Sequence, residues 1–226
     1  LESVRAWPDD AHATPVHGMH IRGDEGGEVS FHAQAEGVDA LAWIVDVPAL
    51  EQRLTEAVRY QPLVTRLDTA QPAAPTVVCE GRASATRAEF GVQFDVQPYP
   101  QQAIAARLVG DKPHGHVARQ WFGDGEILAF LPLDGNAVAM VWSVRQDRVQ
   151  TLLQLPAAEF EAQLEAASGG VLGKPTLTSE RAAWPLQLAR ADRWCGPGWA
   201  LAGDAAHSVH PLAGQGLNLG LSDAQA

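Results

Sequence analysis

The sequence predicts a mixed α+β / α/β fold, and three observations support it. Short apolar runs between residues 102 and 144 are separated by Gly, Asp and Asn turn signals, which is typical of an antiparallel sheet. An apolar strand at 199–202 ends at Gly203-Asp204 and is followed by a glycine-rich turn into a helix, as in open α/β sheets. Helical periodicity over 147–167 adds the remaining class of element.

Composition limits the classes of partner. The 226 residues carry 27 acidic and 16 basic side chains, a net charge of −11, without a Lys or Arg cluster, so no nucleic-acid partner is expected. No apolar run approaches the roughly 18 residues that span a bilayer, and no secretory signal pattern opens the sequence. Two cysteines, Cys79 and Cys195, are too few for a disulfide framework, so we expect buried, inert thiols and a cytoplasmic location.

The first 80 residues predict strands and one helix. Residues 1–14 are polar and contain proline, which indicates an irregular start, and strands are expected at 16–22, 28–34 and 40–46. Asp46 as an N-cap and Pro48 in the first turn predict a helix that ends at Gln61-Pro62. A turn-prone link at 68–75 leads into a short buried strand at 76–79.

The middle of the chain predicts a sheet with helices beside it. Strands are expected at 102–109, 116–122, 126–133 and 137–144, with one face packed on helices and the other lining an apolar cavity. Helices at 147–155 and 157–167 follow, and Gly169-Gly170 ends the second. Strands at 176–184 and 186–194 then return the chain to Gly198. His114 and His116 lie beside a turn and are expected to be solvated.

The last quarter carries the strongest functional signal. Gly203 permits close backbone approach, and Asp204 places a carboxylate at the carboxyl end of a strand, where ligands bind in open α/β sheets. Beyond Pro211, the turn from Gly214 to Asn218 would aim free N–H groups and the positive end of a helix dipole at a ligand. A carboxylate can accept hydrogen bonds from polyol hydroxyls, and a helix N-terminus can stabilise a negatively polarised ring. A flavin dinucleotide is one ligand that has both features.

Other chemistries fit the same residues less well. Asp204, His207 and His210 stand at i, i+3 and i+6, but Pro211 disfavours a continuous helical ligand face, so no metal site is expected. Ser208 has no Gly-x-Ser-x-Gly elbow, which argues against a serine hydrolase. The alternative that Asp204 simply caps the following turn stays open.

Two runs carry a resemblance to a known family. Gly203-Asp204 with the run 210–223, HPLAGQGLNLGLSD, resembles the signature of the ubiquinone-biosynthesis flavin monooxygenases, aromatic hydroxylases related to p-hydroxybenzoate hydroxylase. The run 80–87, EGRASATR, resembles the Asp-Gly motif of the same hydroxylases, with Glu80 where Asp is usual. The resemblance implies FAD as cofactor, NAD(P)H as co-substrate and O₂-dependent hydroxylation of a prenylated phenol or quinone precursor. It implies no catalytic side chain, because the flavin carries the chemistry.

The resemblance also assigns residues and domains. The implied cofactor-binding residues are Gly203, Asp204, Pro211, Gly214, Gln215, Gly216, Leu217 and Asn218, together with Gly81 and Arg87. The implied architecture is a p-hydroxybenzoate-hydroxylase-like fragment. It comprises a partial FAD-binding domain with a strand-rich insertion at 1–98, an antiparallel substrate-binding sheet with helices at 99–184, and a return to the FAD-binding domain at 185–226.

One element of such enzymes is missing from the sequence. No strand–Gly-x-Gly-x-x-Gly–helix unit occurs, so we expect a fragment that binds FAD weakly or not at all and is inactive alone. The family's lipid substrate implies peripheral contact with the inner membrane and with other ubiquinone-pathway proteins. Two alternatives stay open: a non-catalytic assembly or lipid-binding module, and a flavin-dependent reductase of the same fold.

Overall fold

The computed structural model describes residues 1, 4–210 and 214–225, which form two compact units. The first unit combines residues 1–66 and 101–184, and the second combines 67–100 and 185–226. Strands β6 (Phe94–Gly110) and β11 (Ala182–Ala191) each run through both units. The expected boundary at 184/185 coincides with a unit boundary, whereas residues 1–66 group with the sheet of the middle region. The assignment of these parts to FAD and substrate stays a prediction.

The first unit is built on a mostly antiparallel sheet. Its strand order is β6-β9-β8-β7-β2-β3, with β10 beside β6. The further strands are β7 (Val117–Gly123), β8 (Glu126–Pro132), β9 (Ala137–Arg145), β10 (Pro175–Leu177), β2 (Gly18–Arg22) and β3 (Glu28–His32). β6–β9, β9–β8 and β8–β7 are antiparallel, as the short turns predict. β2 instead pairs parallel with β7, from Gly18 opposite Val117 to Arg22 opposite Trp121, and this pairing brings the N-terminal residues to the sheet.

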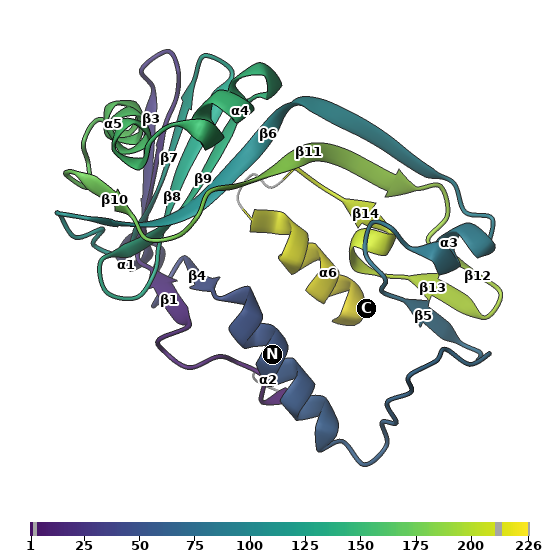
Figure 1. Ribbon diagram of the computed structural model, residues 1–226. Coiled ribbons are helices and arrows are strands. Elements are labelled where there is room, and N and C mark those ends of the chain that lie inside the picture. Colours follow the sequence, from purple (N-terminus) through teal and green to yellow (C-terminus); the bar gives the residue numbers. More distant parts are fainter. Residues whose placement is uncertain (2–3, 211–213, 226) are drawn as a thin grey trace. The chain divides into compact units, whose positions relative to one another are not determined.

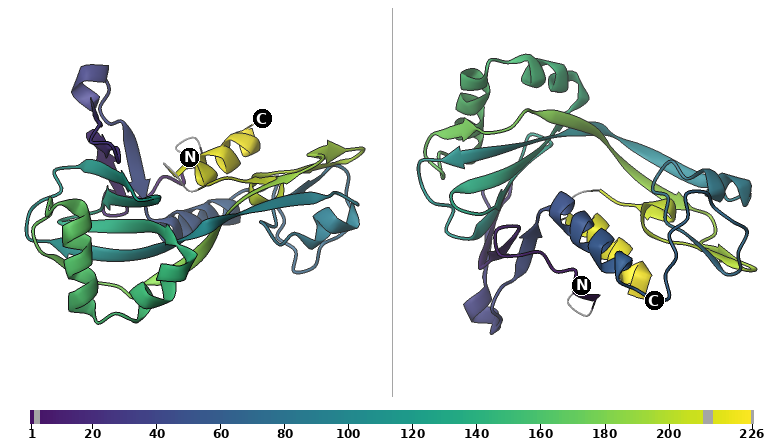
Figure 2. Two further views of the ribbon diagram at one scale, coloured as in Figure 1. Left: turned by 90° about the horizontal axis from the view of Figure 1, so that it is seen from above. Right: turned by 60° about the horizontal axis from the view of Figure 1, so that its bottom comes forward.

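Two helices cover one face of this sheet, α4 (Gln146–Gln154) and α5 (Ala157–Ser168). Figures 1 and 2 show both helices beside β7–β9 in every view. Along β8, Leu128, Phe130 and Pro132 are buried, while the alternate residues are half-buried. Because successive side chains of a strand point to opposite faces, these three buried residues lie on the same face of the sheet. The shared core contains Ile104, Leu108, Leu128, Phe130, Met140, Trp142, Val144, Val149, Leu152, Phe160, Leu164 and Leu172.

The N-terminal region differs from the expected strands. β1 (Ala13–Val16) pairs with β4 (Ala42–Val45), although residues 1–14 were expected to be irregular. A break at His17 interrupts the strand expected at 16–22 and separates β1 from β2. The chain leaves β3 at His32, and a helical turn, α1 (Ala33–Glu36), replaces the expected end of that strand. Helix α2 (Val47–Arg59) confirms the local signals, because the Asp46 side chain accepts a hydrogen bond from Ala49 N at 3.1 Å and proline stands in the first turn.

His114 is buried, with only 3 % of its surface exposed, so the expectation that it is solvated was wrong. Its Nε2 lies 3.0 Å from Leu133 O and 2.9 Å from Gly135 O, and its Nδ1 accepts from His116 N at 3.0 Å. These contacts define the neutral tautomer with the proton on Nε2. Burial lowers the pKa of His114 below its ordinary value, because a cationic ring would be poorly solvated there.

The burial of His114 predicts a dependence of stability on pH. Because its folded-state pKa is lowered, stability is fully present above about pH 6.5 and is lost as the pH falls toward the folded-state value. We expect His114→Gln to flatten this loss between pH 7 and pH 5, measured by urea unfolding at each pH. His32→Gln, at an exposed position, is the control and should keep the wild-type slope. Equal slopes for the wild type and His114→Gln would show that His114 does not titrate in this range.

The second unit contains a small sheet of order β12-β13-β5. β5 (Thr76–Val78) and β13 (Trp199–Leu201) are parallel, and β12 (Cys195–Gly196) is antiparallel to β13. The unit also holds α3 (Ala85–Glu89), the 3₁₀ turn η2 (Gly203–Ala205), β14 (His207–Ser208) and α6 (Gln215–Gln225). Its core is formed by Val78, Val92, Ala191, Leu201, Ala205 and Ala206. Cys79 and Cys195 are exposed free thiols, so the expectation of buried cysteines was wrong.

The long strands also extend beyond their expected bounds. β6 begins at Phe94, eight residues before the expected start at 102, although two prolines lie in this extension. β11 runs continuously through Pro185, where two strands were expected. Among the described residues, no helix has the length and apolar character needed to cross a membrane.

Candidate functional site

The two runs singled out in the sequence follow neighbouring parallel strands. β5 ends at Val78 and β13 ends at Leu201, and these two residues are register partners. The chain therefore leaves the same edge of the sheet toward Gly81 on one strand and toward Gly203-Asp204 on the other. Gly81 and Gly203 have φ values of 75° and 61°, a left-handed conformation that glycine adopts without a Cβ penalty. This edge is where ligands bind in open α/β sheets.

Asp204 presents its carboxylate at this edge. The residue is exposed and lies inside η2, whose N-cap is Ala202, so Asp204 is not the cap of that turn. Its Oδ2 lies 4.0 Å from Arg82 Nε, and both side chains are substantially exposed. Such a solvated pair contributes little to stability, and the carboxylate is therefore accessible for hydrogen bonds from a ligand's hydroxyl groups.

Glu80 organises the second run. Its carboxylate accepts from Thr86 Oγ1 at 2.6 Å, from Ser84 Oγ at 2.7 Å and from Thr86 N at 3.1 Å. These hydrogen bonds, first that of the Thr86 hydroxyl, lower the pKa of Glu80. Ser84 is the N-cap of α3 and accepts from Arg87 N at 3.1 Å. Glu80 therefore holds the loop that begins α3, and its longer side chain reaches residues four and six positions ahead.

Arg87 connects the two runs. Its Nη1 donates to Ala205 O at 3.0 Å and its Nη2 donates to Arg82 O at 2.8 Å. The guanidinium Cζ lies 3.6 Å from the centre of the Phe94 ring, only 7 % of the residue is exposed, and burial lowers its pKa. The structure thus directs Arg87 into the interior of the unit, where it fixes η2 against the loop before α3. A direct contact of Arg87 with a cofactor stays a prediction.

The glycine-rich run leads into α6, which begins at Gln215 as expected. Gly214 precedes the helix with a φ of 64°, and Pro211 lies outside the described residues. Along the first turn Gly214, Gln215, Leu217 and Asn218 are exposed and Gly216 is half-buried. The first N–H groups of an α-helix have no partner within the helix, so this exposed turn is suited to bind an anionic or polarised group.

Sequence reasoning missed Asp223, which it treated only as the last position of the signature. Asp223 Oδ2 accepts from Gly203 N at 2.8 Å and lies 2.8 Å from His207 Nε2. The contact spans twenty positions of sequence and therefore leaves no periodic pattern.

Gly203→Ala tests the left-handed turn at the strand end. A Cβ at position 203 would lie 4.0 Å from Gly220 Cα, an ordinary contact, so the cost arises from the positive φ and should be about 1–2 kcal/mol. Denaturant unfolding measures this cost. Gly216→Ala is the control, because a Cβ there meets nothing within 4 Å and the helix should be stabilised by up to about 1 kcal/mol. Equal effects of the two substitutions would contradict backbone strain at Gly203.

The first unit holds a separate pocket of about 540 Å³. It lies on the helix-covered side of the sheet, and its lining includes Trp121, Leu128, Trp142, Gln163 and Ala166. The sequence predicts an apolar cavity on the face that the helices leave uncovered, where Ile127, Ala129 and Leu131 are half-buried. That expected cavity stays a prediction.

Comparisons with known proteins agree with these features. Residues 32–226 match the FAD binding domain family. The chain is 32 % identical over 228 residues to the ubiquinone hydroxylase UbiL of Rhodospirillum rubrum, covering 91 % of this chain and 53 % of UbiL. It is 30 % identical over 223 residues to the 3-demethoxyubiquinol 3-hydroxylase of Escherichia coli, covering 89 % and 57 %. The chain thus spans about half the length of the curated relatives it matches.

Solved structures show the same fold at lower identity. PqsL of Pseudomonas aeruginosa superposes with a TM-score of 0.78 at 21 % identity, over 96 % of this chain and 68 % of PqsL. The p-nitrophenol 4-monooxygenase PnpA of Pseudomonas putida gives a TM-score of 0.69 at 17 % identity, over 100 % of this chain and 63 % of PnpA. The expected p-hydroxybenzoate-hydroxylase-like fold is confirmed. The chain belongs to the FAD binding domain family, and its sequence is similar to those of the two ubiquinone-pathway hydroxylases named above.

Proposed function

We propose that the full-length protein is an FAD-dependent monooxygenase that hydroxylates the ring of a prenylated phenol or quinone precursor in ubiquinone biosynthesis, with NAD(P)H and O₂. The observation that carries this proposal is the pair of parallel strands β5 and β13, which end side by side and lead into Gly81 and Gly203-Asp204. The names of UbiL and of the E. coli hydroxylase support the substrate class. Peripheral contact with the inner membrane follows from the lipid character of that substrate.

The residues of this chain fit one half of a flavin site. Asp204 would accept hydrogen bonds from ribityl hydroxyls, and the exposed N-terminal turn of α6 would stabilise negative charge on the flavin ring. Backbone groups from Gly214 to Asn218 would line the ring, and the loop at Gly81 would lie toward the pyrophosphate and NAD(P)H. When bound, the flavin supplies the redox and oxygen chemistry, while the protein orients the substrate and excludes water.

Flavin binding and nicotinamide oxidation test the proposal. The protein, purified at its full natural length, should be yellow or become so with FAD, and it should oxidise NAD(P)H. A colourless protein that takes up no FAD and oxidises no nicotinamide would exclude the enzyme and favour a non-catalytic assembly or lipid-binding module. Residues 1–226 alone should bind FAD weakly or not at all. Product analysis with prenylated phenols then tests the substrate class.

Asp204→Ala should weaken FAD binding by about tenfold to a hundredfold, the usual worth of hydrogen bonds to a charged group. Quenching of flavin fluorescence measures the dissociation constant. Asp204→Asn, which keeps one acceptor oxygen, should lose less affinity. Asp95→Ala, at an exposed position of the same unit, is the control and should bind FAD as the wild type does. Wild-type affinity in Asp204→Ala would remove Asp204 from the site.

A further inference from the structure

Helix α6 is joined to the strand-end turn through the side chain of Asp223. Asp223 Oδ2 accepts from Gly203 N at 2.8 Å and from the His207 ring at 2.8 Å, and both side chains are half-buried. The two donors belong to η2 and β14, which follow β13 directly. One carboxylate oxygen therefore joins the helix to the segment that carries Asp204.

In the part of the chain that the structure describes, α6 contributes little to a buried apolar core. None of its described residues is buried, so apolar packing gives the helix no deep anchor. Gly220 of α6 also lies close to Gly203, because a Cβ on Gly220 would lie 3.5 Å from Gly203 Cα.

His207 is a rigid partner for this contact. Its backbone pairs with Arg190 in the β11–β14 ladder, and its ring packs 4.9 Å from the ring of Trp194. Trp194 in turn donates its Nε1 proton to Ala191 O at 3.2 Å. The strand pairing and the packing on Trp194 fix the position of His207 independently of α6. Its contact with Asp223 therefore positions the helix.

We propose that Asp223 is a positioning residue of the flavin site, which sets where the N-terminal turn of α6 lies relative to Asp204. This inference rests on the proposed function, because it assigns Asp223 a role in holding the flavin-binding elements. Asp223 itself contacts Gly203 and His207, and it acts through the helix and the turn that it joins. A displaced helix would present its N–H groups and dipole less well to the ring, so both affinity and reduction potential should respond.

Three variants of the full-length protein test this role: Asp223→Ala, Asp223→Asn and Ser222→Ala. We expect Asp223→Ala to weaken FAD binding by about tenfold, as loss of charge-assisted hydrogen bonds does, and to make the reduction potential of bound flavin more negative. Asp223→Asn keeps an acceptor oxygen and should recover affinity to within about threefold of the wild type. Ser222→Ala, at an exposed position of the same helix, should change neither quantity.

The outcomes separate this inference from the proposed function. A wild-type protein that binds no FAD overturns the proposed function, whatever the variants do. A wild-type protein that binds FAD, with unchanged affinity and potential in Asp223→Ala, overturns the positioning role alone. If Asp223→Ala fails to fold by circular dichroism, His207→Phe carries the test, because phenylalanine keeps the packing on Trp194 and removes the Nε2 donor. Unchanged affinity and potential in His207→Phe then overturn the role.

Discussion

Replacing Phe160 by alanine is expected to lower the free energy of unfolding by about 3–5 kcal/mol. Phe160 is fully buried in α5, where its ring lies 6.1 Å from the ring of Trp142. The Arg181 guanidinium lies 4.8 Å from the centre of the Phe160 ring and donates to carbonyls at the end of α4, Leu152 O and Leu155 O. The substitution therefore opens a cavity between helix and sheet that fixed neighbours cannot close.

Hydrogen exchange of α5 peptides, followed across a urea series, measures this cost within the first unit, because the two units need not unfold together. Phe31→Ala in β3 is the matched control; 43 % of Phe31 is exposed, so its loss should cost under about 1 kcal/mol. Phe160→Leu should cost about 1.5 kcal/mol or less. Equal losses for Phe160→Ala and Phe31→Ala would contradict a close-packed core at α5.

Sequence signals were sufficient to predict those elements whose ends and turns are specified by neighbouring residues. Asp46 caps α2, and α5 ends at Gly169, whose φ of 66° only glycine adopts readily. The turns between β7, β8 and β9 also determined their antiparallel order. In each case the residues that specify the element lie within a few positions of it.

Pairings between distant segments could not be predicted in the same way. The parallel pair β2–β7 joins residues about a hundred positions apart, and nothing in the alternation of either strand identifies its partner. His114 shows the same limit for burial, because the carbonyls that satisfy it belong to the turn at 133–135. Its position beside a turn suggested exposure, while hydrogen bonds to a later turn decided the outcome.

In the candidate site, too, features specified by adjacent residues were predictable, and contacts between distant residues were not. The strand end at Gly203-Asp204 and the start of α6 were predictable, since both are read from adjacent residues. The inward direction of Arg87 and the Asp223 contact were not, because their partners lie 118 and 20 positions away. Sequence reasoning therefore identified the groups at the edge, and the structure supplied the side chains that hold them there.

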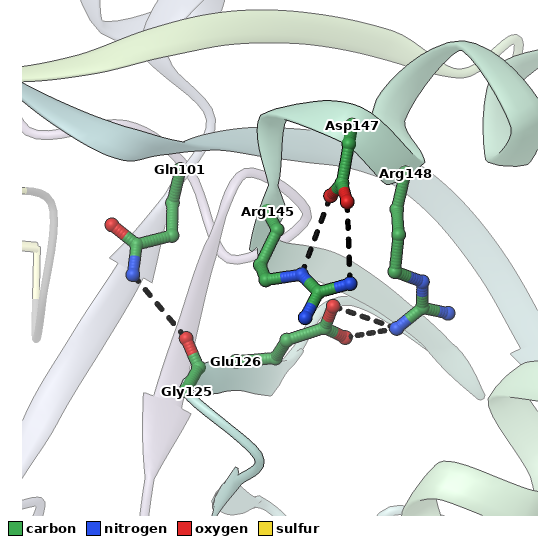
Figure 3. Close-up of polar contacts among 6 residues, drawn as sticks. All are labelled: Gln101, Gly125, Glu126, Arg145, Asp147 and Arg148. Atoms are coloured by element: carbon green, nitrogen blue, oxygen red, sulfur yellow. Dashed lines mark hydrogen bonds and ion pairs between the residues drawn. The ribbon is translucent and has the colours of Figure 1, made fainter.

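Replacing Arg148 by methionine should destabilise the first unit by about 3 kcal/mol, because a nearly buried carboxylate loses its cation. Arg148 Nη1 lies 2.6 Å from both carboxylate oxygens of Glu126, whose side chain is only 10 % exposed (Figure 3). Arg145→Met is the matched control in the same view. Arg145 pairs with Asp147 at 3.3 Å, but both side chains are well exposed, so its loss should cost at most about 1 kcal/mol.

Urea unfolding of the double variant Glu126→Gln, Arg148→Met separates two causes of this loss. Arg148 also lies over the Trp142 ring, with its Cζ 5.7 Å from the ring centre, so methionine removes packing as well as charge. If the orphaned carboxylate sets the cost, Glu126→Gln should restore part of the stability, because the neutral amide needs no counter-charge. A double variant as unstable as Arg148→Met would attribute the cost to the lost contact with Trp142, since the charge of Glu126 would then have no measurable effect.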